Sequence, residues 1–164
     1  MRTISATVPV NDPDLTDQVR LTRDDVWAGL QRKARNAVPY VPAIQECTVV
    51  ANTPDGLVRE VVMLGERVRE EVVFHPKWRV SFSRRDERAT WLIHNDIGED
   101  ENGLTLTFSF MIDLGHDEEA DREADRMRAG YLEAMRNTLA LTRESVASTE
   151  SAPDEQDSGR RPTV

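Results

Sequence analysis

The sequence predicts an α+β protein in which a seven-stranded, curved antiparallel sheet wraps around one long C-terminal helix, with one or two short helices after the first strand. Two observations predict this architecture. Residues 117–149 contain no Pro and one Gly, and their apolar residues recur at the spacing of one helical face. Most of the preceding chain alternates with the period of strands, interrupted by turn residues. A sheet with one apolar face has to bury it, and the long helix provides the cover.

The first strand and the short helical part come first in the chain. Apolar and polar residues alternate over residues 2–10, as in a half-buried strand. A helix is expected to start at Thr22, because Thr22 and Asp25 have the spacing of a capping box, with Asp in place of the usual Glu. Pro39 and Pro42 end this helical part, since proline lacks a backbone N–H and its ring clashes with the preceding turn.

Six further strands follow, separated by turn signals such as Thr53-Pro54-Asp55-Gly56. The last strand has the clearest alternation, from Leu104 to Ile112. Strands this close in sequence are expected to pair with their neighbours as a meander. Their expected ranges are 44–52, 57–64, 67–75, 78–83, 88–97 and 104–112.

Composition favours one folded domain and limits its partners. Residues 1–147 are expected to form the domain, and residues 148–164 to form a disordered polar tail. The net charge of −9 disfavours nucleic acid and anionic membranes as partners. Cys47 is the only cysteine, so we expect no intramolecular disulfide and a cytoplasmic location. The chain lacks a run long and apolar enough for a membrane span, and we expect a monomer or weak homodimer.

Four short phrases resemble one known family. They are Val8-Pro9-Val10-Asn11, Leu21-Thr22-x-x-x-Val26-Trp27-x-Gly29-Leu30, Val58-Arg59-Glu60-Val61 and Leu104-Thr105-Leu106-Thr107-Phe108. Together with the element order, they resemble the AtaL-like family of the SRPBCC superfamily, which includes START and birch-pollen-allergen-like proteins. The resemblance covers residues 3–146. It implies a helix-grip fold with a hydrophobic ligand cavity between sheet and long helix, and it implies no particular reaction.

The inward-facing residues are the expected lining of that cavity. By itself an apolar face is explained equally by a packed core, and the resemblance favours a cavity. Tyr131 and Asn95 are the polar candidates for orienting a ligand, although a rim tyrosine and a cross-strand amide explain them as well. The predicted lining is Trp27, Leu30, Val72, Phe74, Val80, Phe82, Trp91, Ile93, Asn95, Leu106, Phe108, Phe110, Met127, Tyr131 and Met135.

The other polar residues offer few candidates for a metal site or a catalytic site. Strand alternation turns one of Arg59 and Glu60 inward, but an exposed strand edge with both side chains solvated is the favoured interpretation. The three histidines lack the spacing of a metal site, and Cys47 has no companion. We therefore predict no metal, no cofactor and no assigned catalytic residue.

Three functions remain open at this point. The first is non-enzymatic binding of a small hydrophobic molecule, such as a metabolite or a polyketide-like intermediate. The second is an enzyme of secondary metabolism, of the cyclase, dehydratase or hydrolase type, with Tyr131, Glu60 or His94 as acid or base. The third is a protein-interaction module. Converging buried polar groups favour the enzyme, a smooth apolar cavity favours the carrier, and a filled interior with an exposed apolar patch favours the module.

Overall fold

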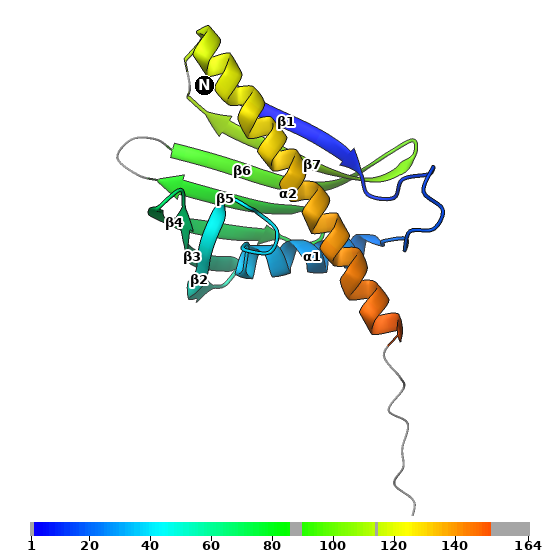
Figure 1. Cartoon of the computed structure of the whole chain (residues 1–164). Helices are drawn as coiled ribbons and strands as arrows, with labels where there is room; N and C mark the ends of the chain where they lie inside the picture. The colour runs from blue at the N-terminus through cyan, green and yellow to red at the C-terminus, as the bar shows by residue number, and fades with distance from the viewer. Residues whose placement is uncertain (1, 86–89, 114, 152–164) are drawn as a thin grey trace, which may run out of the picture.

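A computed structural model of the chain describes residues 2–85, 90–113 and 115–151. It contains seven strands and two helices (Figure 1). In chain order they are β1 (Arg2–Pro9), α1 (Arg23–Arg35), β2 (Ile44–Thr53), β3 (Gly56–Met63), β4 (Glu66–His75), β5 (Arg79–Arg85), β6 (Thr90–Asp100), β7 (Gly103–Ile112) and α2 (Glu118–Ser151).

The strands form one antiparallel sheet in the order β1-β7-β6-β5-β4-β3-β2. The predicted meander is confirmed for β2 to β7, and β1 adds to it by pairing with β7, its most distant strand in sequence. Strand β6 continues beyond its predicted end at Ile97 as far as Asp100. The reason is that the turn needs only two residues: Asp100 pairs with Gly103, whose φ of 117° suits glycine.

Helix α2 runs diagonally across the sheet, and α1 lies beside it (Figure 1). At 34 residues α2 is roughly 50 Å long by the helical rise of 1.5 Å per residue. It includes residues 148–151, which the sequence analysis assigned to the tail. Near this end the Thr149 hydroxyl donates a hydrogen bond to the Ser145 carbonyl. The rest of the predicted tail lies outside the described residues.

The start of α1 is the predicted capping box. Thr22 accepts a hydrogen bond from the Asp25 N–H, and the Asp25 carboxylate accepts one from the Thr22 N–H. Only this one helix lies between β1 and β2 in the described chain. Where α1 crosses α2, a Cβ on Gly29 would collide with the Thr142 hydroxyl, so Gly29 allows the two helices to approach closely.

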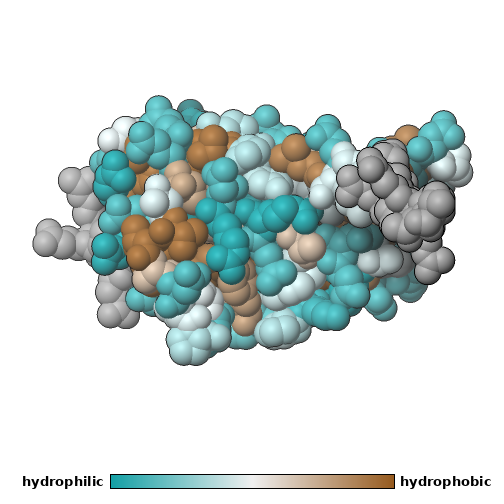
Figure 2. Space-filling model, turned by 90° about the horizontal axis from the view of Figure 1, so that it is seen from below, coloured by the Kyte–Doolittle hydropathy of each residue, from teal (hydrophilic) through white to brown (hydrophobic). Residues whose placement is uncertain are grey.

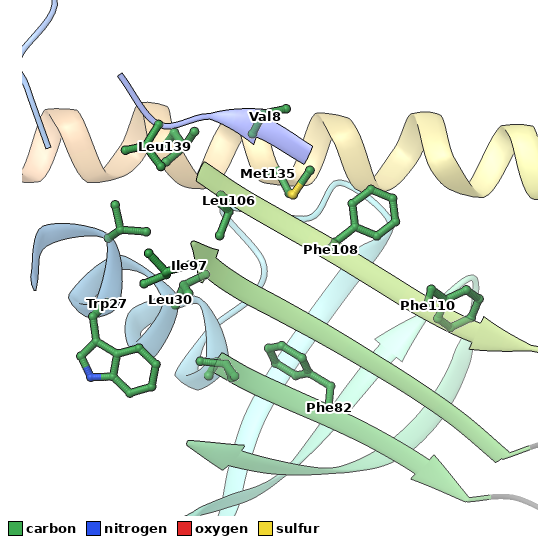
Figure 3. Close-up of a cluster of buried hydrophobic side chains, with 14 of the residues drawn as sticks. Val8, Trp27, Leu30, Phe82, Ile97, Leu106, Phe108, Phe110, Met135 and Leu139 are labelled. Carbon is green, nitrogen blue, oxygen red and sulfur yellow. The ribbon is translucent and has the colours of Figure 1, made fainter. Parts of the chain in front are cut away.

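The core fills the space between the inner face of the sheet and the two helices (Figure 3). Leu106, Phe108 and Phe110 of β7 point inward, and the helices contribute Leu30 and Met135. The expected register is confirmed, because Phe82 pairs with Ile93, Asn95 pairs with Phe108, and Phe74 pairs with Val80, all on one face. Large rings and branched side chains therefore occupy most of the interior.

Candidate functional site

One part of the interior is polar. Its five side chains, a polar cluster, come from α1 and four neighbouring strands, and each is less than one-tenth exposed. Four of them occupy inward positions of strands, in phase with apolar residues. The members of the polar cluster are Lys33, Arg59, Glu70, Arg84 and Asn95.

Arg59 and Glu70 form a buried ion pair. They face each other across β3 and β4, and the Glu70 Oε1 lies 3.1 Å from the Arg59 Nε and 3.0 Å from its Nη2. The Arg59 Nη1 donates to the carbonyls of Lys33 and Ala34, at 3.2 and 3.0 Å. These carbonyls belong to the last turn of α1, whose groups have no helical partner. Arg59 therefore holds the end of α1 against the sheet.

Lys33 is the second feature of the cluster. Its Nζ donates a hydrogen bond to the Asn95 Oδ1 at 2.8 Å. Burial and then the Arg59 guanidinium lower the pKa of Lys33, the Glu70 carboxylate acts in the opposite direction, and together they bring it to about 7. The amine is therefore about half uncharged at neutral pH.

Tyr131 and Trp91 border the polar cluster. The Tyr131 ring packs on Phe108 and Phe110, with centroids 5.0 and 5.4 Å apart. Burial and then the Glu70 carboxylate raise the pKa of the Tyr131 hydroxyl, so it stays protonated. The Trp91 Nε1 is buried and has no hydrogen-bond partner among the described residues. A buried N–H without a partner is costly, and a ligand oxygen would satisfy it.

A cavity of about 50 Å³ lies between this cluster and α2. Lys33, Arg59, Glu70 and Asn95 form its polar wall, and Ala134 of α2 is part of the opposite wall. Four of its lining side chains are partly exposed: Val41, Met63, Ile93 and Tyr131. A neighbouring pocket of about 20 Å³ lies against Glu70, Arg84 and Trp91.

Both spaces are much smaller than the roughly 300–1,000 Å³ of typical ligand pockets. A ligand larger than a few waters therefore has to move part of the wall, and partly exposed lining side chains such as Val41 and Met63 are the ones with room to move.

The predicted lining residues divide into three groups. Four of them line the cavity: Phe82, Ile93, Asn95 and Tyr131. Trp91 lines the smaller pocket. The others lie in the packed core or against it, because their rings and branched chains fill the space beside the helices: Trp27, Leu30, Val72, Phe74, Val80, Leu106, Phe108, Phe110, Met127 and Met135.

The structure also places the acid and base candidates. Glu60 lies on the outer face of the sheet and pairs with Arg69 at 3.2 Å, and His94 is also outside, with its Nδ1 2.8 Å from the Ser81 hydroxyl. Of these candidates only Tyr131 lines the cavity. The favoured interpretation of Arg59 as a solvated edge residue is wrong, because the register turns it inward to Glu70.

Sequence reasoning missed Lys33, Glu70 and Arg84 as site residues. Lys33 lies three residues after Leu30 on the buried face of α1. Glu70 is in phase with Val72, and Arg84 is in phase with Phe82. The sequence signal for these buried residues was a charged residue at a position where the helical or strand period places apolar ones.

Larger hollows exist on the surface, but they lack buried functional groups. One of about 600 Å³ lies between the end of β1, residues 12–18 and α2. Leu15, in its wall, is half exposed, and Arg143 already donates to the carbonyls of Val19 and Val10. This arginine thereby fastens the segment after β1 to α2, which explains its position.

The described residues offer little for a metal or a membrane. Among residues 2–85, 90–113 and 115–151, no three His, Cys, Asp or Glu side chains are grouped to hold a metal ion. No helix in that part of the chain is long and apolar enough to cross a membrane.

Comparison with known proteins agrees with this fold. The family described as AtaL, acetylaranotin biosynthesis cluster protein L, matches residues 4–149. No curated protein matches the chain by sequence.

Solved structures share the fold at low sequence identity. The Zhui aromatase/cyclase from Streptomyces sp. R1128 superposes with a TM-score of 0.65 at 14% identity, covering 92% of this chain and 99% of that one. The di-domain ARO/CYC StfQ from the steffimycin biosynthetic pathway gives 0.63 at 13% identity, covering 89% of this chain. This chain spans about half of StfQ, 52% of its length. A START superfamily protein from Mycobacterium smegmatis gives 0.57 at 14% identity, covering 88% and 98%.

Proposed function

The chain belongs to the AtaL family, and from this premise we propose that it binds a small, mainly apolar molecule with an oxygen-bearing end in the cavity beside the polar cluster. The apolar body would lie against Phe82, Ile93 and Tyr131. The oxygen atoms would face Lys33, Asn95 and the smaller pocket at Trp91.

The observation that carries this proposal is an excess of buried hydrogen-bond donors around the cavity. Lys33 uses one hydrogen bond, to Asn95, and the Trp91 Nε1 uses none among the described residues. Buried polar groups are normally satisfied, because an unmade hydrogen bond costs about 1–3 kcal/mol. Oxygen atoms of a ligand are the acceptors that this site lacks.

The charge of the site also selects an oxygen-bearing end. Two guanidinium groups, of Arg59 and Arg84, share the interior with one carboxylate, of Glu70. The buried charge is therefore positive, even with Lys33 neutral. Replacing buried charges by apolar residues is often neutral or stabilising, so stability alone does not explain this set. Perturbed groups in a cavity are typical of functional sites.

Catalysis in the same cavity is the second candidate. It is favoured by the buried contact of 2.8 Å between Lys33 and Asn95, two polar groups that converge at the cavity wall. The interaction module has less support. Figure 2 shows hydrophobic residues on one face in separate patches among hydrophilic ones, and the exposed large apolar residues are spread along the chain.

Titration with 1-anilinonaphthalene-8-sulfonate tests the binding proposal, because this dye joins apolar rings to an anionic oxygen group. The matched variants are Ala134→Val, at the cavity wall, and Ala129→Val, exposed on the same helix. Both substitutions have the same cost in helix propensity.

We expect saturable binding of one dye per chain. Ala134→Val should weaken it at least about tenfold, or 1.4 kcal/mol, because the added methyl groups occupy the cavity, and Ala129→Val should leave it unchanged. Unsaturable fluorescence, or equal affinity in both variants, would contradict the proposal.

A further inference from the structure

Lys33 is unusual in this chain, because lysine is rare here and this lysine is buried. The chain has two lysines, and the other, Lys77, is exposed and pairs with Asp24 at 2.9 Å. Lys33 is 7% exposed and lines the cavity. Among the described residues the only hydrogen bond of its Nζ is to the Asn95 Oδ1.

The surroundings of Lys33 favour an uncharged amine. The Arg59 guanidinium stacks over the Phe82 ring at 4.7 Å, and the Lys33 Nζ lies 5.9 Å from the same ring. The Glu70 carboxylate, which would stabilise an ammonium, is bound twice by Arg59. Desolvation and a neighbouring cation both activate lysine amines as nucleophiles in proteins, because each lowers the pKa of the amine. They agree with a pKa of about 7 for Lys33.

We propose that Lys33 is a nucleophile that forms an imine with an aldehyde or ketone bound in the cavity. The inference rests on the proposed function, since the cavity has to admit the ligand, and it specifies the oxygen-bearing end as a carbonyl group. The Asn95 Oδ1 is a positioning group, because it accepts an amine hydrogen and so orients the Lys33 Nζ in the cavity.

The chemistry balances without any further reagent. The amine lone pair attacks the carbonyl carbon, a C–N bond forms, and the carbonyl oxygen takes up a proton to give a carbinolamine. The C–O bond then breaks, and the oxygen leaves as water with the two hydrogens of the original amine. The Tyr131 hydroxyl, which is protonated and lines the same cavity, donates a proton to the leaving oxygen and recovers one from the amine nitrogen as the C=N bond forms, so the tyrosine is unchanged overall. The product is the imine C=N bond to Lys33.

Reductive trapping tests the proposal on the full chain. The protein is treated at pH 7 with butanal and sodium cyanoborohydride, which reduces an imine to a stable secondary amine. Peptide mass spectrometry then compares butylation of Lys33 with that of Lys77. At pH 7 an amine of pKa about 7 has on the order of 10³ times more of its neutral form than an ordinary lysine. We expect Lys33 to react at least about tenfold faster than Lys77. The expected ratio is below about 10³ because an amine of lower pKa, such as that of Lys33, is intrinsically less nucleophilic. Labelling of Lys77 with Lys33 unmodified would overturn the proposal.

Two sets of variants test whether labelling of Lys33 depends on the cavity and on its contact with Asn95. Ala134→Val should suppress labelling of Lys33 and spare that of Lys77, whereas Ala129→Val should change neither. Asn95→Asp places a carboxylate where the amide is, which favours the ammonium and should slow labelling at pH 7, with recovery toward pH 9. Labelling of Lys33 that is insensitive to Ala134→Val would mean attack from bulk solvent, and would overturn the proposal.

The two proposals can fail separately. If the dye binds at one site sensitive to Ala134→Val and Lys33 is not labelled, imine formation is refuted and the binding function stands. If neither the dye nor butanal reaches the cavity, both are refuted.

Discussion

The packed core beside α2 and the polar cluster lie on the same strands, but they have different roles. In the core, Phe108 of β7 is fully buried among apolar neighbours such as Met135. Directly opposite Phe108 on β6 is Asn95, where the polar cluster begins. Burial of apolar surface stabilises the first region. The polar cluster buries charges at a desolvation cost and leaves hydrogen-bond donors unpaired. The core therefore stabilises the fold, whereas the polar cluster provides the groups of the candidate site.

The largest effect is expected in the core. Phe108→Ala should lower the free energy of unfolding by about 3–5 kcal/mol, because it removes a large buried ring and leaves a cavity. Thr107→Ala, on the outer face, should cost far less, since it loses a hydrogen bond of 2.7 Å to Thr7 near solvent. Urea unfolding measures both. Equal losses would show that the inner and outer faces of β7 do not differ in packing.

The buried ion pair should respond in a non-additive way. Arg59→Met should cost about 3–5 kcal/mol, because it leaves the Glu70 carboxylate buried without a partner. Arg59→Met with Glu70→Met should recover at least about half of that loss, since no buried charge then remains at the pair. Urea unfolding of both single variants and the double variant completes the cycle. Additive losses would mean that the pair stabilises the fold as ordinary packing does.

The difference between these regions also explains what the sequence could predict. Alternation such as that of Leu104 to Ile112 predicted the strands and their inner faces, because period 2 follows directly from strand geometry. The pairing of β1 with β7 depends on tertiary packing, which local periodicity does not encode.

The site was less predictable than the fold. Asn95 and Tyr131 were identified from their positions on apolar faces, whereas Lys33 and Glu70 were missed, because a charged residue on such a face does not by itself show whether it is buried or solvated. Their burial depends on Arg59, which binds Glu70 and the end of α1 together. The size of the cavity depends on how rings from several elements fill the interior, and no single segment determines it.

Lys33 should make stability depend on pH in a defined direction. Its pKa falls from 10.5 in the unfolded chain to about 7 in the folded one, so between these values the unfolded chain binds more protons. Stability should therefore rise with pH, by up to about 1.4 kcal/mol per unit above pH 7. Below pH 7 both states are protonated, and the cost of burying the charge is fully present.

Urea unfolding from pH 7 to 9.5 checks this for the wild type and Lys33→Met. The variant should lack the rise. Tyr131, whose pKa is raised, contributes only above about pH 10, where an ordinary tyrosine ionises. Parallel curves for the two proteins would show that Lys33 is charged in the folded state.

The smallest effect is expected at Tyr131. Tyr131→Phe should change the free energy of unfolding by less than about 1 kcal/mol, because the hydroxyl makes no hydrogen bond with the described residues and the ring contacts remain. Dye affinity should stay within about tenfold. Thermal and urea unfolding, with dye titration, measure both quantities. A loss of several kcal/mol would assign the hydroxyl to the core instead of the cavity.

Native mass spectrometry of the protein purified from its own host tests the central claim most directly, because it weighs the chain together with any molecule held in its interior. The account predicts that wild type and Ala129→Val retain a small molecule of the same mass, and that Ala134→Val does not. The mass of the chain alone in all three proteins, or an equal bound mass in Ala134→Val, would contradict a binding site between the polar cluster and α2.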